Sequence, residues 1–198
     1  MTLRPTAVVA ISFLAGMATF FAQGFLPYAF TSFANSASGW TLVTVLLLAW
    51  ARVPTVLAGA LGAASFALLT AGYAVSANLQ GLFYDPTLFV VVGLAVGPFI
   101  GVATSWLRSG VSWRAAAGTS LLSGIGLGEA YFGLTAVAET TSPIYWTVIG
   151  VISLGLLAAM LLRSLRGVYA VVLAVAGTGA IAAVFILAFS ALGAAPLT

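Results

Sequence analysis

The chain contains no cysteine, no histidine and no lysine, and only three of its 198 residues are aspartate or glutamate. Without cysteine there is no disulfide framework and no thiol chemistry. Zinc and iron sites built from protein ligands need the missing His and Cys side chains. A catalytic serine would lack a His or Lys base, and an aspartyl dyad cannot form when Asp85 is the single aspartate. We therefore expect no enzyme, no metal and no cofactor.

Charge is also scarce, because charged residues make up 5% of the sequence and hydrophobic residues 63%. A soluble domain has roughly 25% charged residues, so this composition is typical of a multi-pass membrane protein. The six basic residues are scattered between apolar segments and form no basic stripe, which argues against a nucleic-acid partner. The lipid bilayer is the expected partner.

Apolar segments recur along the whole chain, and most are long enough to cross a bilayer core of about 30 Å. The sequence predicts an all-α, polytopic transmembrane helix bundle forming a single domain over residues 1–198. The first segment exceeds the apolar region of a cleaved signal peptide, about 7–15 residues, so we expect it to remain as a span. The second is the shortest and begins between Ser36 and Trp40. The seven predicted spans are residues 6–26, 40–51, 54–76, 87–107, 115–137, 143–162 and 168–192.

Proline marks three places in these helices. Asp85 before Pro86, and Ser142 before Pro143, each pair a capping side chain with a proline suited to the first helical position. Pro98 instead lies inside a predicted span, where it removes a backbone donor and predicts a kink. Broken membrane helices often border cavities, although most intramembrane prolines are only kinks.

The distribution of charge predicts the topology. With seven spans and the N-terminus inside, all six arginines fall in inner segments, whereas Asp85 and Glu139 fall in outer loops. This arrangement satisfies the positive-inside rule, and Trp and Tyr side chains flank the spans as interfacial belts do. The sequence therefore predicts a multi-pass protein of the cell inner (plasma) membrane with its C-terminus outside.

Glu129 is the single acidic residue within a predicted span. A charge in hydrocarbon costs from about 2.5 to over 10 kcal/mol, so such a residue is a functional candidate by default. Its helical face is mostly small, with Gly126 and Gly133 nearby, which predicts a groove. At about 1.5 Å per residue it lies ~24 Å from Trp113, in the outer part of the bilayer core. Three interpretations remain open: a neutral acid hydrogen-bonded to a neighbouring helix, a receptor for a cationic, amine or hydroxylated ligand, and a proton relay.

Several polar and aromatic residues are predicted at the same outer level as Glu129, although each alone is equally well explained as a belt or loop residue. The function that this pattern favours is binding or transport of a small solute, with a cationic or donor group, through an outer-half pocket around Glu129. The alternative is a non-transporting structural or accessory subunit that has a membrane-protein partner. The predicted ligand-binding residues are Glu129, Tyr131, Asn35, Trp40, Tyr145 and Trp146, with Gln23, Tyr28 and Tyr84 as further residues of that level.

Four short segments resemble the motifs of a family of small, uncharacterised actinobacterial membrane proteins known only as a domain of unknown function. The segments are Phe33-Ala-Asn-Ser-Ala-Ser-Gly-Trp40, Gly97-Pro-Phe-Ile-Gly101, Trp106-Leu-Arg-Ser-Gly110 and Gly128-Glu-Ala-Tyr131. The resemblance covers roughly residues 10 to 165, and the chain has Ala130 where the family usually has glycine. It implies no activity. A looser likeness, in size and apolar character, is to the substrate-binding S subunits of energy-coupling-factor vitamin transporters, which usually have six spans and an outward-facing pocket.

Overall fold

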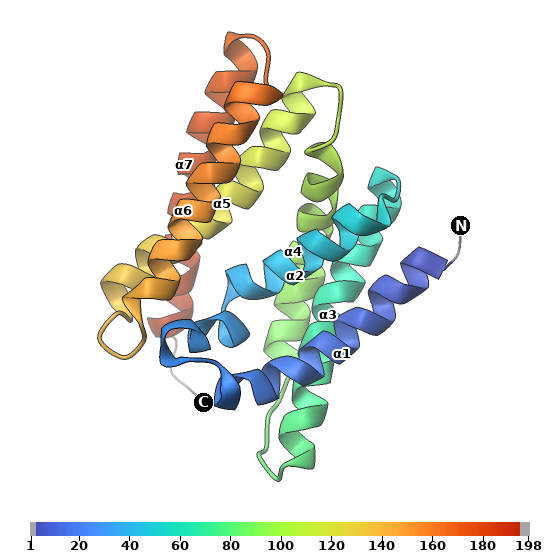
Figure 1. Ribbon diagram of the computed structural model, residues 1–198, viewed down its shortest axis with the longest axis vertical. Helices are drawn as coiled ribbons and strands as arrows, with labels where there is room; N and C mark the ends of the chain where they lie inside the picture. The colour runs from blue at the N-terminus through green and yellow to red at the C-terminus, as the bar shows by residue number, and fades with distance from the viewer. Residues whose placement is uncertain (1–2, 195–198) are drawn as a thin grey trace. The chain divides into compact units, whose positions relative to one another are not determined.

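The computed structural model describes residues 3–194, and every regular element over that range is helical (Figure 1). Each predicted span corresponds to an α-helix whose ends differ from the prediction by a few residues. The elements are α1 (Leu3–Phe25), the 3-10 helix η1 (Tyr28–Asn35), α2 (Ala37–Ala51), α3 (Thr55–Leu79), α4 (Thr87–Trp106), α5 (Ser112–Ala136), α6 (Pro143–Arg163) and α7 (Val168–Ala194).

Five of these helices are long and apolar enough to cross a membrane, namely α1, α3, α4, α6 and α7, and a sixth span results if η1 and α2 are counted together. The structure thus supports a polytopic helix bundle, while the count of seven spans stays a prediction. α2 alone is too short for this standard, and α5 falls below it although it is 25 residues long. Glycine, serine and alanine dominate its sequence, and most of its central residues are buried. A helix covered by its neighbours does not need a lipid-soluble surface.

The segment before α2 is the main local departure from the sequence prediction. We expect a polar connection there, and the structure has η1, which meets α2 at an angle of 69°. The Trp40 indole nitrogen donates to the carbonyl of Ala34 at 3.1 Å, and the Ser36 side chain accepts from the backbone N–H of Gly39. With 15 residues at about 1.5 Å each, α2 by itself is shorter than a bilayer core of about 30 Å.

The predicted start of α6 is confirmed, whereas α4 begins at Thr87, so that Pro86 precedes the helix and is not its first residue. The Ser142 side chain accepts from the N–H of Ile144 at the start of α6, with Pro143 in the first turn. Asp85 Oδ1 accepts from the backbone N–H of Thr87 at 2.9 Å and from its hydroxyl at 2.6 Å. These bonds satisfy backbone donors that have no partner within the helix itself.

The helices pack into two compact units, Met1–Trp106 and Leu107–Thr198. In the first unit, α3 packs against α1 and α4, and it runs in the same direction as α1 (Figure 1). Glycines allow the backbones to touch, because a side chain at Gly16 would overlap the backbone of Leu69, and one at Gly62 would overlap that of Gly97. Close contacts therefore include the pair α1 and α3, which are not consecutive in sequence.

Buried hydroxyl groups add polar links inside this first unit. Ser65 Oγ of α3 lies 2.7 Å from Ser12 Oγ of α1 and 3.1 Å from Thr44 Oγ1 of α2, and all three side chains are fully buried. A hydroxyl in an apolar interior needs such partners, because leaving it unpaired costs the desolvation free energy. The three groups form a hydroxyl chain that joins α1, α2 and α3.

In the second unit α5 packs against both α6 and α7. Ser120 Oγ of α5 lies 2.9 Å from the carbonyl oxygen of Leu173 in α7. The core at the end where α5 begins includes Ala116, Met160 and Leu165. This unit contains four of the six predicted ligand-binding residues, including Glu129.

Candidate functional site

Glu129 lies in the second half of α5, and only 3% of its surface is exposed. The contacts of α5 within the second unit define where it lies on the helix. Gly124 and Gly128 face α7, whereas Gly126 and Gly133 face α6. At about 100° per residue, Glu129 is roughly 40–60° from the α6-facing glycines and farther from the α7-facing ones. Glu129 therefore lies at the side of the α5–α6 contact.

The small residues beside Glu129 accommodate α6. A side chain at Gly126 would overlap the Ser153 hydroxyl, and one at Gly133 would overlap the indole of Trp146. At these positions the groove expected from sequence is filled by α6 side chains. The glycines thus allow close helix packing and fix the depth at which α6 lies beside the carboxylate.

Trp146 and Tyr145 are both buried at the start of α6, and Trp146 belongs to this contact. Their rings meet edge to face with centroids 4.8 Å apart, and the Trp146 indole nitrogen donates to Thr141 Oγ1 at 2.8 Å. Each interaction restricts the ring rotamers, so Trp146 presents a fixed surface to α5 one helical turn beyond Glu129. The structure therefore brings these two predicted residues to the helix pair that carries Glu129.

Tyr131 is not brought to the same place. It lies two residues after Glu129, roughly 200° around the helix, and its side chain is 58% exposed. Sequence proximity is a poor guide here, because side chains two positions apart in an α-helix point to nearly opposite sides.

The remaining predicted ligand-binding residues, Asn35 and Trp40, lie in the first unit. Asn35 is exposed at the end of η1. Trp40 belongs to an aromatic cluster centred on Tyr73, whose ring centroid lies 6.3 Å from that of Trp40, 5.0 Å from Tyr84 and 5.7 Å from Phe20. Rings this close pack against one another and leave no room for a ligand between them.

Two members of this aromatic cluster were not among the residues predicted from sequence, Tyr73 and Phe20. Gln23 Nε2 donates to the Tyr73 hydroxyl at 3.2 Å, which places Gln23 beside the cluster, while Tyr28 is 66% exposed. The sequence offered one signal for Tyr73, namely that it is a large aromatic residue with a polar hydroxyl among the small residues of α3. The pairing of α1 with α3, which brings these side chains together, has no such signal in the sequence.

The loop at the edge of the cluster carries two perturbed groups. Partial burial raises the pKa of Tyr84, and the nearby Tyr73 and Asp85 add to this effect. The pKa of Asp85 is held below its usual value by hydrogen bonds from the side chain and then the backbone of Thr87. Both directions follow from the stated contacts, since burial opposes a phenolate and donated hydrogen bonds favour a carboxylate.

Pro98 lies within α4, and the helix continues through it. The glycines on either side pack against α3, because a side chain at Gly97 would meet the backbone of Gly62, and one at Gly101 would overlap that of Ala58. The backbone beside the proline is thus covered by α3, so this stretch of the α3–α4 contact is closely packed.

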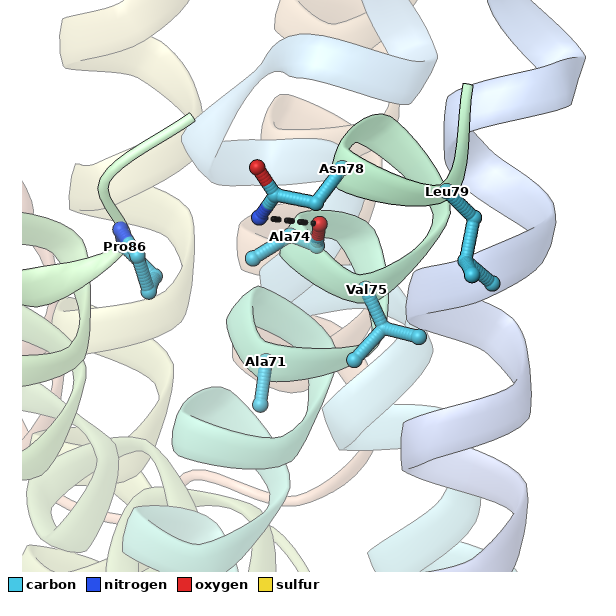
Figure 2. A pocket seen from close by; sticks show the side chains of 6 residues that line it. All are labelled: Ala71, Ala74, Val75, Asn78, Leu79 and Pro86. Carbon is cyan, nitrogen blue, oxygen red and sulfur yellow. Dashed lines mark hydrogen bonds between the residues drawn. The ribbon is translucent and has the colours of Figure 1, made fainter. Parts of the chain in front are cut away.

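An open, apolar hollow lies at the C-terminal end of α3 (Figure 2). It has a volume of about 500 Å³, and the single polar side chain in its lining, Asn78, is bonded to the carbonyl of Ala74 at 2.9 Å. We call it the α3 hollow. Its lining residues are Ala71, Ala74, Val75, Asn78, Leu79 and Pro86.

Within residues 3–194, no three acidic, histidine or cysteine side chains gather into a group that could hold a metal ion. The chemistry available near Glu129 is therefore that of one buried carboxylate beside buried aromatic rings. It can accept hydrogen bonds or pair with a positive charge.

Taken together, the apolar helices and their packing define a multi-pass, all-helical membrane protein. A family model matches residues 1–194, and the chain belongs to that family, the family of unknown function DUF6518. Comparisons with curated proteins and with solved structures gave no match.

Proposed function

We propose that this protein binds a small solute at Glu129 and moves or retains it at the plasma membrane. The observation that carries the proposal is a carboxylate that is only 3% exposed, in the helix least suited to contact lipid. Ionisable residues inside membrane proteins are costly and most often belong to substrate, ion or proton pathways. The solute class that suits a carboxylate is a small molecule with an ammonium group or a hydroxyl donor.

The packing of α5 supports this role, because a binding carboxylate must be held in place. Glycine contacts hold α5 against α6 and α7, and the Trp146 ring fixes the level of α6 one turn from Glu129. A site built on helices that are locked by their neighbours loses little entropy when a ligand binds.

The test uses the purified full chain in nanodiscs and thermal unfolding with ethanolamine, choline, putrescine and inositol as probes. At least one probe should raise the unfolding temperature of the wild type in a concentration-dependent way. The variant Glu129→Gln keeps the shape of the side chain, and we expect it to weaken binding about 30-fold, or about 2 kcal/mol. Glu129→Leu should abolish the response.

The proposal would be contradicted in either of two ways. One is the absence of a shift with every probe in the wild type. The other is an equal shift in wild type and Glu129→Leu, which would leave Glu129 as a tolerated buried acid. A matched control is Glu139→Gln, because this second glutamate lies between α5 and α6 outside both helices. It should leave the response unchanged.

A second candidate is an accessory subunit that docks on another membrane protein. The observation in its favour is the α3 hollow, which is open and apolar (Figure 2). Small side chains such as Ala71 and Ala74 let a partner helix approach closely in a membrane. Native mass spectrometry after mild extraction should then show a mass above that of the chain itself. Val75→Trp, which fills the hollow, should remove the added mass, whereas the exposed control Val56→Trp in the same helix should not.

A further inference from the structure

The second unit has an exposed group of arginines at one end. α5 and α6 run in opposite directions, so the start of α5, the end of α6 and the α6–α7 turn lie together (Figure 1). The shared core beneath them confirms this arrangement, because Ala115 and Ala116 of α5 cluster with Met160, Leu165 and Ala170. Exposed basic side chains in these three segments are Arg114, Arg163 and Arg166, which we call the arginine rim, and Arg108, four residues before α5, is exposed as well.

Among the described residues of the second unit, no aspartate or glutamate lies near the arginine rim. Glu129 is in the second half of α5, and Glu139 lies in the α5–α6 connection at the opposite end of both helices. The Arg114 guanidinium lies over the Trp113 ring, 5.4 Å from its centroid, an arrangement that orients the charge without neutralising it. The rim therefore presents three positive charges that attract an anion.

Large apolar side chains are exposed directly beside these charges. Leu162 and Val168 are 79% and 80% exposed, Tyr169 is 73% exposed, and Trp113 of the α5 start is 44% exposed. A free phosphate ion would bind to the guanidinium groups but would not cover these apolar surfaces. A phospholipid satisfies both, because its phosphodiester pairs with arginine while its acyl chains cover Leu162 and Val168.

We propose that the arginine rim binds an anionic phospholipid headgroup through Arg163 and Arg166, with Arg114 as the third contact. Basic residues beside a membrane surface attract acidic lipids, and arginine pairs with phosphate in a bidentate manner. The interfacial positions of Trp113 and Tyr169 are consistent with a headgroup at this level. This inference does not depend on the function proposed for Glu129.

The experiment measures lipid binding to the purified full chain by native mass spectrometry, with phosphatidylglycerol and phosphatidylcholine as probes. The wild type should bind phosphatidylglycerol more tightly than phosphatidylcholine. Arg163→Gln together with Arg166→Gln should reduce phosphatidylglycerol affinity about 30-fold, roughly fivefold for each arginine. The charge-matched control is Arg4→Gln with Arg52→Gln in the first unit, which should change the affinity less than about threefold.

Three outcomes would overturn the proposal. Equal losses in the two double variants would mean a general effect of net charge. Full competition by millimolar inorganic phosphate would mean a free-anion site, and tighter binding of poly-glutamate than of lipid would mean an acidic protein partner.

A second double variant covers the case in which the glutamine variant does not fold. Arg163→Lys with Arg166→Lys keeps the charge and loses the bidentate geometry, so it should retain lipid binding at reduced affinity. If phosphatidylglycerol bound this variant no more tightly than phosphatidylcholine, that result would equally count against the rim.

Discussion

The indole ring of Trp146 occupies the space in which a side chain at position 133 would lie, so α6 touches α5 at Gly133. This contact is one helical turn beyond Glu129, on the same side of α5. Trp146 is held by its hydrogen bond to Thr141 and by the ring of Tyr145. The position of α6 relative to the buried carboxylate therefore depends on a glycine that carries no chemistry of its own.

The first prediction is that Gly133→Ala destabilises the protein. The new methyl group would overlap the rigid, rotamer-restricted ring of Trp146, which cannot move aside at low cost. We expect a loss of about 1–3 kcal/mol, as for overpacked cores, measured by denaturant or thermal unfolding in detergent. The matched control is Gly155→Ala in α6, because the space around Gly155 is open. That change should be neutral or stabilise by up to about 1 kcal/mol through helix propensity, and an equal loss in both variants would refute the contact.

How far the sequence predicts the fold can be judged from particular elements. The helices were predictable because long apolar segments end at legible signals, such as Ser142 before Pro143 at the start of α6. The 3-10 helix before α2 was not, since the eight residues from Tyr28 to Asn35 are too few for their pattern to distinguish a short helix from a loop. Pairings between non-consecutive helices were also hidden. Glycines mark close approach, but they do not say which helix approaches.

The candidate site was predictable in its centre and less so in its surroundings. Glu129 stood out because a charge is rare in an apolar helix. Gly126 and Gly133 suggested a groove, and the structure fills both positions with α6 side chains, because small residues serve helix contact as readily as ligand access. Tyr131 was predicted as a ligand-binding residue because it is close to Glu129 in sequence, but its side chain is exposed on another side of α5. Tyr73 could be recognised as part of the aromatic cluster only once the pairing of α1 with α3 was known.

The second prediction concerns the hydroxyl chain of the first unit. Ser65→Ala should destabilise by about 1–2 kcal/mol, since it leaves both Ser12 and Thr44 without their shared partner in a buried environment. Ser12→Ala should cost less, because Ser65 keeps its bond to Thr44. A double-mutant cycle between Ser12 and Ser65 measures the coupling.

The control for this cycle is in the same helix. The Ser76 hydroxyl is buried in α3 and has no hydrogen-bond partner within the described part of the chain. Ser76→Ala should therefore be neutral or stabilising, because it removes an unpaired polar group. If Ser65→Ala and Ser76→Ala had the same effect on the free energy of unfolding, the hydroxyl chain would not contribute to stability.

The third prediction is a pH dependence at the start of α4. The folded pKa of Asp85 lies below its unfolded value because Thr87 donates two hydrogen bonds to the carboxylate. A depressed pKa contributes stability above the unfolded value, about 3.9, and that contribution is lost as the pH falls through the folded pKa. Asp85→Asn should thus be less stable than the wild type near neutral pH, with the difference shrinking below about pH 4.

Thr87→Val provides the matching change on the donor side. It removes the hydroxyl bond and leaves the backbone N–H in place, so the pKa of Asp85 should rise toward its usual value. Thermal unfolding of the three proteins across the acidic range measures the effect. A difference between wild type and Asp85→Asn that stays constant with pH would show that the charge of Asp85 does not contribute to the cap.

The fourth prediction is that α5 crosses the membrane although its composition is less apolar than that of its neighbours. Its 25 residues, at about 1.5 Å each, span roughly 37 Å, more than a bilayer core of about 30 Å. Contacts with α6 and α7 cover its small and polar residues, so lipid need not solvate them. Reporter fusions after Ser109 and after Thr140, which flank α5, should therefore report opposite sides. Fusions after Gly81 and after Ser109 flank the more apolar α4 and should also differ, which verifies the reporter. The same side for Ser109 and Thr140, with opposite sides across α4, would remove α5 from the spans and place Glu129 outside a transmembrane pathway.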